Sequence, residues 1–240
     1  MGWHLPVSSY LYLEGNRFLL RLNLVLMETE RRVEDVDFRG GHPALDLVDT
    51  VGGMLDTPPA PEDEFLRSYD DLVALGLKTD TLSEPAARRL RRAASQRPED
   101  AQAALRAALE ARALLDSVFR PVADGVAPPA QALEELAALG ATAMSRGRLV
   151  EDGGHVEWSW EDAPGLEAPL WPLVHSAVEL VTNGPLDRLS CCGRCRWLFL
   201  DTTKNHSRRW CSMEGCGTDA KVERYVARRR ERRAASAAAG

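Results

Sequence analysis

The stretch between residues 42 and 183 has the spacing of amphipathic helices. Apolar side chains recur there at intervals of three and four residues, which places them along one face of a helix. Prolines and glycines interrupt the pattern and set the limits of the expected helices. These helices are residues 43–51, 63–75, 83–95, 98–119, 129–144 and about 169–181.

Two of these helices indicate which side chains form a core. An apolar stripe packs against neighbouring helices, while the opposite face of each helix stays polar. The predicted core positions are Leu105, Leu109, Ala113 and Val118 in the helix 98–119, and Leu133, Leu136, Ala137 and Leu139 in the helix 129–144.

Between residues 148 and 160 the spacing changes. Val156, Trp158 and Trp160 alternate with other residues after the pair Gly153 and Gly154, and residues 149–150 are apolar before it. Alternation around a glycine pair predicts a two-stranded hairpin, which we expect to cover an edge of the helical bundle. The fold class expected for residues 36–184 is therefore a mainly helical domain with a small β-hairpin.

Residues 183–185, Asn-Gly-Pro, are the expected boundary of this domain, because they are typical of a turn or hinge. A second module is predicted over residues 188–233, followed by a disordered tail over residues 234–240. Residues 1–35 are expected to be a disordered extension, unless the chain starts at Met27.

Charge divides the chain in the same place. The whole chain carries 30 basic and 36 acidic residues, and its net charge is −6. Residues 188–233 hold thirteen basic and five acidic residues, a balance of +8, which leaves −14 for the remainder. This division indicates two modules with different partners.

Residues 5–27 are rather apolar, but they do not resemble a membrane segment. Glu14, Arg17 and Arg21 interrupt the apolar residues, and no basic segment precedes them. A membrane span needs about 20 apolar residues, so neither a span nor a cleavable signal peptide is predicted. We expect a cytoplasmic protein without a membrane partner.

All five cysteines lie between residues 191 and 216, which excludes a disulfide framework spread over the fold. Cys192 and Cys195 form one pair, and Cys211 and Cys216 form another after a loop of fifteen residues. Each pair makes a tight turn, and the loop folds one pair back onto the other, as a tetrahedral Zn²⁺ site requires. Four thiolates leave no position for water, so the pattern predicts one structural zinc ion without Lewis-acid chemistry.

Three alternatives concern the same segment. Cys191 is spaced poorly for a ligand turn with Cys195, and we interpret it as a free thiol that acts as a small apolar residue. His206 lies in the middle of a polar loop and is interpreted as a solvated side chain. A redox function for Cys192 and Cys195 would need a βαβ context and would leave the second pair unexplained.

A basic helix is expected directly after the last cysteine. Thr218 or Asp219 fits its N-cap, and Val222 and Val226 are expected to pack on the metal site. Basic side chains in the preceding loop extend the surface, since two adjacent arginines cannot both point inward. An ordinary solvated charged helix is the alternative. The candidate nucleic-acid contacts are Lys204, Asn205, Arg208, Arg209, Lys221, Arg224, Arg228, Arg229 and Arg232.

Residues around the cysteines resemble the CGNR zinc finger family, in segments 197–201, 204–205, 207–213 and 216–217. Upstream, residues 41–50 (GHPALDLVDT) resemble the opening of the ABATE domain, which usually precedes this finger in proteins regarded as bacterial stress-induced transcription regulators. The resemblance implies a helical domain followed by a treble-clef-like or ribbon-like zinc module with a basic helix. It also implies the same four zinc ligands as the spacing.

The chain departs from the tetrapeptide that names the family. Cys216 and Gly217 are followed by Thr218 and Asp219, where the family has asparagine and arginine. A carboxylate in place of a cation removes a potential phosphate or base contact and adds repulsion toward DNA, although aspartate suits the first turn of a helix. We therefore expect weaker or differently specific binding than in relatives.

A polar cluster opens the first helix of the helical domain. His42 precedes this helix, and Asp46, Asp49 and Thr50 fall on one face of it. The four residues are candidates for a small-ligand pocket. The alternative is that His42 caps the helix and Asp46 holds a nearby loop. The sequence contains no recognisable catalytic triad, phosphate loop or paired catalytic carboxylates, so no enzymatic activity is predicted.

These observations predict a zinc-dependent, DNA-binding transcription regulator. Its N-terminal domain would sense a small-molecule inducer or form a homodimer. Two alternatives are an RNA- or ribosome-binding zinc module and a zinc-stabilised protein-interaction module.

Overall fold

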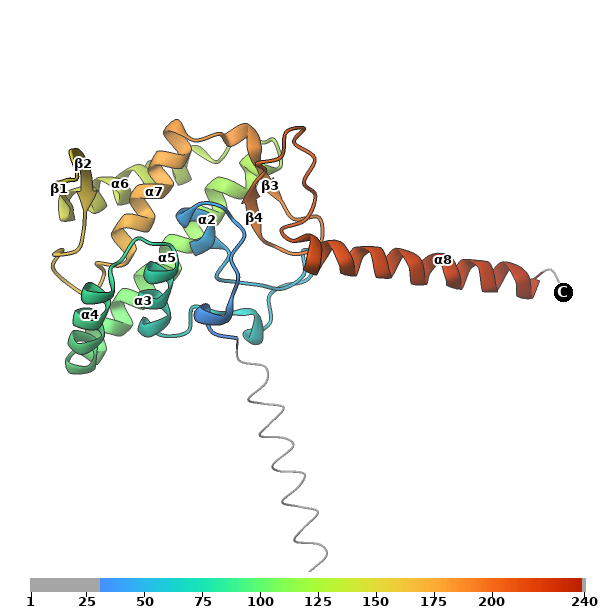
Figure 1. The fold of residues 1–240 in the computed structure, drawn as a ribbon, viewed down its shortest axis with the longest axis horizontal. Helices are drawn as coiled ribbons and strands as arrows, with labels where there is room; N and C mark the ends of the chain where they lie inside the picture. Colours follow the sequence, from blue (N-terminus) through green and yellow to red (C-terminus); the bar gives the residue numbers. More distant parts are fainter. Residues whose placement is uncertain (1–30, 239–240) are drawn as a thin grey trace, which may run out of the picture.

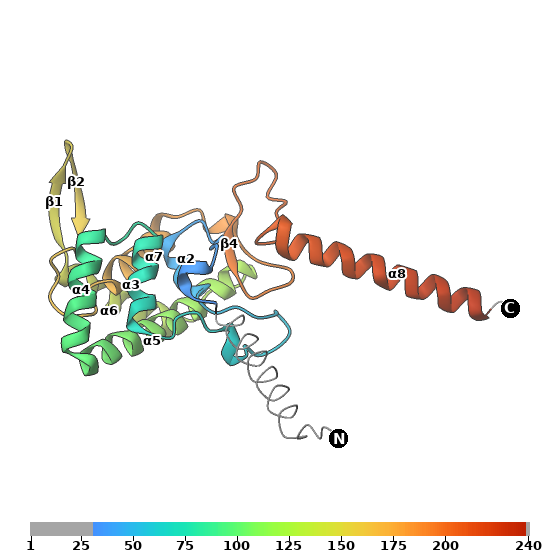
Figure 2. The same cartoon turned by 60° about the horizontal axis from the view of Figure 1, so that its bottom comes forward.

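The computed structural model describes residues 31–238 of the chain. Its body is a packed group of helices, with a β-hairpin at one end and a small cysteine-rich module at the other (Figure 1). A long helix leaves this module and projects away from the body, as both views show (Figures 1 and 2). The expected fold class, a mainly helical domain followed by a small metal-binding module with a helix, is confirmed.

The elements follow the expected order along the chain. The helices of the body are α2 (Pro43–Val48), α3 (Tyr69–Lys78), α4 (Glu84–Gln96), α5 (Pro98–Ala123), α6 (Ala130–Arg146) and α7 (Leu170–Asn183). The strands are β1 (Arg148–Asp152) and β2 (His155–Ser159) in one hairpin, and β3 (Leu189–Cys191) and β4 (Leu198–Leu200) in another. A π-helical turn (Met213–Gly217) leads directly into α8 (Thr218–Ala238).

Both ends of the described chain differ from the sequence prediction. Helix α8 continues to Ala238, so it extends into the segment expected to be a disordered tail. Val33 lies within the expected extension, in a short 3₁₀ helix (Val33–Asp35), and its side chain is buried. The rest of that extension, including the alternative start at Met27, lies outside the described residues.

Helix α3 begins later than the hydrophobic spacing predicts. Ser68 is its N-cap, and the Ser68 Oγ accepts a hydrogen bond from the Asp71 N–H at 3.2 Å. The Asp71 carboxylate in turn accepts from the Ser68 N–H at 2.8 Å. This reciprocal capping box satisfies two donors that a helix end leaves free, and it fixes the start at Tyr69 instead of residue 63.

The stripe of α5 that faces the core is made largely of alanines. Val118 is buried as predicted, and Leu105 and Leu109 are half-buried and pack against the core, but Ala113 is exposed, so this one of the four predicted core positions is wrong. Short side chains allow neighbouring helices to approach α5 closely, and the leucines then pack along the edges of the contact. The buried residues are Ala101, Ala104, Ala108, Ala111, Leu115, Val118 and Phe119.

Helix α6 packs on α7 through a similarly small residue. A Cβ atom at Gly140 would lie 2.6 Å from the Val178 Cγ2, so only glycine permits this approach of the two helices. Leu136 is buried as predicted, while Leu133 and Ala137 are exposed, because the contact runs through Gly140.

The hairpin β1–β2 forms where the alternation predicts it. Arg148 pairs with Ser159 and Asp152 with His155, and Gly153 and Gly154 make the turn with positive φ angles of 58° and 91°. Glycine adopts these angles without a steric penalty. Directly after the hairpin, the buried Trp160 donates from Nε1 to the Ala143 main-chain oxygen at 2.7 Å.

The second hairpin, β3–β4, joins the cysteine-rich module to the helical body. Leu189, Leu198 and Leu200 are buried in the same apolar cluster as the helices. The expected boundary at residues 183–185 separates segments of the chain, but the apolar core continues across it. No helix within residues 31–238 is both long and apolar enough to cross a membrane.

Candidate functional site

Four thiols converge at the end of the body from which α8 projects. The Sγ atoms of Cys192, Cys195, Cys211 and Cys216 all lie within 4.8 Å of one another. Cys195 Sγ is 3.5 Å from Cys211 Sγ, which is 3.6 Å from Cys216 Sγ. These are the four cysteines that the spacing singled out.

Two turns hold the thiols in place. The first turn follows β3, where the Cys192 N–H donates to the Trp197 main-chain oxygen at 2.9 Å. The second contains Cys211 and leads into the π-helical turn that carries Cys216. A main-chain hydrogen bond of 3.0 Å from Gly193 to Arg209 joins the two turns.

The donor set fits a structural zinc ion. With Zn–S bonds of about 2.3 Å, the edge of a tetrahedral ZnS₄ unit is about 3.8 Å, close to the observed sulfur separations. Burial raises the pKa of the Cys216 thiol, so a cation is needed to keep it as a thiolate. One structural Zn²⁺ bound by the four-cysteine module completes the coordination shell.

Cys191 lies outside this cluster. Its side chain is half-buried on β3, and its Sγ is 3.5 Å from the Arg120 Nη1. Burial raises the pKa of this thiol. This position matches a packed free thiol better than a metal ligand.

Aromatic side chains surround the metal site. Phe199 is fully buried beside Cys192 and Cys211, with Trp197 and Trp210 packed against this cluster. The Trp197 Nε1 donates to the Val51 main-chain oxygen at 3.2 Å, which ties the module to the helical body. These contacts make a small apolar core around the thiols.

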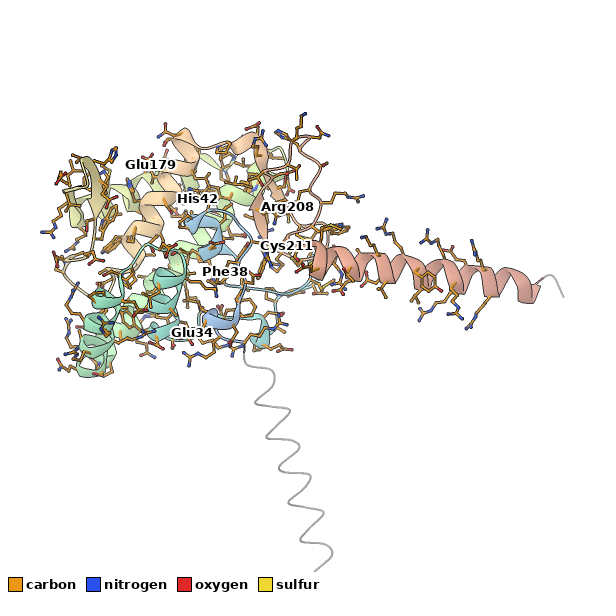
Figure 3. All side chains as sticks on the ribbon, in the orientation of Figure 1. Glu34, Phe38, His42, Glu179, Arg208 and Cys211 are labelled. Atoms are coloured by element: carbon orange, nitrogen blue, oxygen red, sulfur yellow. The ribbon has the colours of Figure 1, made fainter. Side chains whose placement is uncertain are left out.

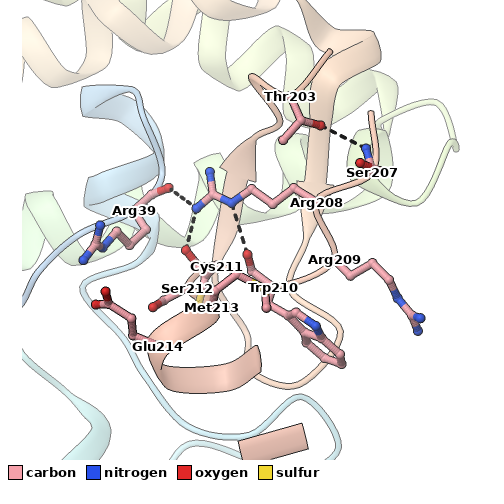
Figure 4. A pocket seen from close by; sticks show the side chains of 10 residues that line it. All are labelled: Arg39, Thr203, Ser207, Arg208, Arg209, Trp210, Cys211, Ser212, Met213 and Glu214. Atoms are coloured by element: carbon pink, nitrogen blue, oxygen red, sulfur yellow. Dashed lines mark hydrogen bonds between the residues drawn. The ribbon is translucent and has the colours of Figure 1, made fainter. Parts of the chain in front are cut away.

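Arg208 and Arg209 differ in direction although they are adjacent. The Arg208 guanidinium turns inward and lies over the Phe199 ring, 4.2 Å from its centroid. Arg209 is exposed, with its guanidinium 5.5 Å from the Trp210 centroid, and Figure 4 shows it pointing away from the other side chains. Arg208 donates to the main-chain oxygens of Arg39, Leu200, Trp210 and Cys211.

These bonds give Arg208 a structural role that the sequence did not indicate. One guanidinium connects β4, the second cysteine turn and the loop before α2, and most of its donors are used within the fold. The contact of Arg208 with nucleic acid stays a prediction. Arg209 is exposed to solvent, as such a contact requires.

We expect Arg208→Lys to lower the free energy of unfolding of the zinc-loaded protein by about 2–4 kcal/mol. Lysine keeps the charge, but it lacks the planar fork that serves several carbonyl groups at once. Arg209→Lys is the matched control and should change stability by less than about 0.5 kcal/mol. Urea unfolding measures both, and equal stability of the two variants would contradict the structural role of Arg208.

The other predicted loop contacts are exposed. Lys204 and Asn205 lie at the loop tip, beside the exposed His206, whose φ of 47° places it in the left-handed region. Asp201 holds the base of this loop, because its carboxylate accepts hydrogen bonds from the Thr203 and Arg208 N–H groups at 2.8 and 2.9 Å. The basic tip is therefore presented to solvent from an ordered base.

Helix α8 is exposed over residues 221–234. Side chains extend from it above and below in Figure 3, and every residue from 221 to 234 is exposed. Val222 and Val226 are 55% and 38% exposed, so the expected packing of these valines on the metal site is wrong. The second turn of the helix contacts the first cysteine turn through Glu223, which pairs with Arg194, and not through these valines. Its predicted contact residues are Lys221, Arg224, Arg228, Arg229 and Arg232.

Arg194 fixes the base of α8. This arginine lies between the first two cysteines and is 3.3 Å from the Asp219 carboxylate and 2.6 Å from the Glu223 carboxylate. Asp219, the departure from the family tetrapeptide, is thus paired within the module. The expected N-cap also moves, because Ser212 caps the continuous helical segment by accepting from the Gly215 N–H at 3.1 Å.

An aromatic side chain missed by the sequence analysis lies within the basic surface of α8. Tyr225 is 59% exposed, and it lines a shallow hollow together with Arg228, Arg229 and Arg232. The sequence contained a signal for this, because Tyr225, Arg228 and Arg232 follow one another at intervals of three and four residues and so share one face of a helix.

The predicted pocket residues of the helical domain have partners within the fold. The His42 Nδ1 accepts from the Ala44 N–H at 3.4 Å as the N-cap of α2, and Asp46 accepts from the Gly40 N–H at 3.2 Å. Thr50 Oγ1 donates to the Leu47 oxygen at 2.7 Å. These contacts correspond to the capping and loop-holding alternative.

Asp49 connects the helical domain to the zinc module. The fully buried carboxyl group accepts from the Leu198 N–H of β4 at 2.8 Å through Oδ1. Burial raises the pKa of Asp49 well above its ordinary value, which favours the neutral acid. The first helix of one domain thereby positions the second hairpin.

We expect the half-buried Asp46 to make stability depend on pH. Burial raises its pKa to about 6, against the opposing effect of the Gly40 hydrogen bond. The folded chain then binds more protons than the unfolded chain between about pH 4 and 6, so this residue's contribution to stability falls as the pH rises through that range. Above this pH range, the ionised Asp46 carboxylate destabilises the fold by a constant amount of about 1–3 kcal/mol.

Asp46→Asn tests this, because the amide oxygen still accepts from Gly40. The variant should match the wild type near pH 4 and exceed its stability by about 1–3 kcal/mol at pH 7. Urea unfolding at each pH gives the free energies of unfolding of the variant and the wild type. The contribution of zinc cancels in the difference between them. Asp56→Asn, at an exposed position, is the control, and a pH-independent difference for Asp46→Asn would contradict the assignment.

A four-thiolate site that carries a basic helix and is built onto a helical domain defines a zinc finger protein. Residues 188–229 match the CGNR zinc finger family. Residues 41–184 match the ABATE family, described as "putative stress-induced transcription regulator". Since this match covers more than half of the chain, the chain belongs to the ABATE family and carries a C-terminal CGNR zinc finger. No curated protein matched the chain.

Proposed function

We propose that this protein is a zinc-dependent transcription regulator that binds duplex DNA through α8. The observation that carries the proposal is the free projection of α8 from the zinc module, with its basic side chains exposed along the helix. The membership in a family of transcription regulators supports it.

The dimensions of α8 suit a groove of DNA. A helix with its side chains is about 10–12 Å across, and the major groove of B-DNA is about 12 Å wide. A helix inside the groove has DNA on most of its sides, which matches a helix whose side chains are exposed all round. Arginines spaced along it reach phosphates on both flanks, and some reach base edges.

Zinc and Arg194 supply what the helix alone lacks. An isolated charged helix has little stability in water, and its direction is undefined. The metal site holds Cys216 at the start of the helix, and Arg194 pairs with the carboxylates of its first turns. We infer that this arrangement orders α8 before it meets DNA.

For the helical domain we propose ligand sensing or dimerisation. The body shares its apolar core with the finger, so a change at α2 reaches the zinc module through Asp49 and Leu198. A homodimer would present two basic helices and double the phosphate contacts. Sedimentation equilibrium with and without DNA measures the oligomeric state.

Selection of duplexes from a random DNA library, with the full-length zinc-loaded protein, tests the proposal. We expect an enriched sequence and binding that weakens steeply with salt. Structured and single-stranded RNA of equal length serve as competitors, and preference for RNA would support the RNA-binding alternative. Absence of salt-sensitive binding to either nucleic acid would leave the protein-interaction alternative.

A further inference from the structure

A cavity of about 650 Å³ lies at the base of α8 (Figure 4). Its walls come from three separate segments: the loop after β4, the second cysteine turn and the loop that precedes α2. The volume falls within the range of about 300–1,000 Å³ found for small-ligand sites. The side chains that matter for its chemistry are Arg39, Arg208, Arg209, Ser207, Ser212 and Glu214.

Positive charge dominates the walls of this cavity. Three guanidinium groups line it against one carboxylate, that of Glu214. Arg39 also pairs with the exposed Asp37, and Arg208 bonds main-chain oxygens, so neither charge is cancelled by a buried acid. Ser212 caps the helical segment that continues into α8, and the positive end of this long helix adds to the potential.

Arg39 and Arg209 lie on opposite sides of the cavity, and few contacts within the fold hold their side chains. Among the described residues, the Arg209 guanidinium has the Trp210 ring as its side-chain neighbour, 5.5 Å from the ring centroid, and the Arg39 side chain is 42% exposed. Arg209 can turn toward an anion between them without giving up a side-chain hydrogen bond to the described residues, and Arg39 would exchange its exposed pair with Asp37 for the anion. Arginine forks match the oxygens of a phosphate group, which also accept hydrogen bonds from hydroxyl groups such as that of Ser207.

We propose that this cavity binds a phosphate group of a nucleic-acid backbone. The inference rests on the proposed function and extends it, because Arg39 belongs to the segment before α2. The helical domain is then part of the nucleic-acid interface. A phosphate held at the base of α8 sets how deeply, and at which point along the backbone, the helix enters the groove.

The test measures duplex affinity by fluorescence anisotropy at several salt concentrations with the zinc-loaded full chain. Arg39→Ala and Arg209→Ala are each expected to lower affinity about fivefold, and the double variant should reduce the salt slope by about one. Arg39→Ala keeps the main-chain oxygen that Arg208 bonds. Arg92→Ala, an exposed arginine on α4, is the matched control and should change neither quantity.

Two further arms separate the possible outcomes. Arg228→Ala/Arg232→Ala tests α8: if it abolishes binding while the Arg39 and Arg209 variants behave like Arg92→Ala, the proposed function stands and the cavity proposal is overturned. Thermal unfolding without DNA compares sodium phosphate with chloride at equal ionic strength. Stabilisation by inorganic phosphate that needs Arg39 and Arg209, with unchanged DNA affinity of their variants, would assign the cavity to free phosphate and also overturn the nucleic-acid occupant.

Discussion

Removal of zinc will unfold the cysteine-rich module and leave most of the helical body folded. The module has a small apolar core around Phe199, and four thiols lie at its centre. Without the metal, Cys216 and the base of α8 are joined to the first cysteine turn by the ion pairs of Arg194 with two exposed carboxylates, by one main-chain hydrogen bond between the two turns and by a few apolar contacts. Zinc binding contributes about 10–16 kcal/mol in comparable finger peptides, far more than such pairs.

The body should survive because its core is made by α2 to α7. Leu189, Leu198 and Leu200 belong to that core, so part of the β3–β4 hairpin is expected to remain packed after zinc is lost. Hydrogen exchange should therefore rise sharply in residues 192–238 and little in α5 and α7.

Cys211→Ser and chelation test this expectation by zinc analysis and hydrogen exchange. Wild type should hold one zinc per chain, and Cys211→Ser should lose stoichiometric zinc at micromolar metal concentrations. Cys191→Ser is the matched control and should keep both the zinc and the protection of the module. Full zinc content and an unchanged exchange pattern in Cys211→Ser would refute the four-thiolate site.

Neutralising the basic stripe of α8 will abolish tight DNA binding without unfolding the protein. The triple change Arg224→Ala/Arg228→Ala/Arg232→Ala removes three exposed charges, and alanine is the best helix former. We expect affinity to fall about 100- to 1,000-fold at about 0.1 M salt, with a decrease of the salt slope by about three. Circular dichroism should show unchanged helix content.

A matched triple variant on the body controls for net charge. Arg88, Arg92 and Arg106 are exposed on α4 and α5, and their replacement by alanine changes the total charge equally. Its affinity should stay within about threefold of wild type. Equal losses in both triple variants would mean that binding follows net charge alone. No loss after charge reversal of Arg224 and Arg228 would favour a protein-interaction module.

The helices and the metal site were largely predictable because their signals are local. The prolines and glycines that flank α4, α5 and α7 predicted where these helices start to within a few residues. The pair Gly153 and Gly154 located the first hairpin. The four cysteines were found by spacing alone. The start of α3 was missed although Ser68 and Asp71 form a local cap, because apolar spacing was weighted above the capping signal.

What the sequence could not give depends on contacts between distant segments. Arg208 and Arg209 are chemically identical, and part of what holds Arg208 inward comes from the distant segments that supply the Arg39 and Leu200 carbonyl groups. Asp219 was interpreted as a source of repulsion toward DNA, whereas its partner Arg194 lies 25 residues earlier in the chain. The core stripe of α5 was misjudged because small residues were not expected to face the closest neighbours.

Because α8 projects freely from the zinc module, a small change in the angle of the helix moves its far end by several ångströms. At 1.5 Å per residue, the 21 residues of this helix extend for about 31 Å from the zinc module. A rotation of about 6° at its base moves the far end by about 3 Å, close to the rise of about 3.4 Å per base along a DNA strand. If α8 binds DNA as proposed, a small tilt of β4 against α2, at the hydrogen bond between Leu198 and Asp49, is therefore enough to shift the tip of the helix from one base pair to the next.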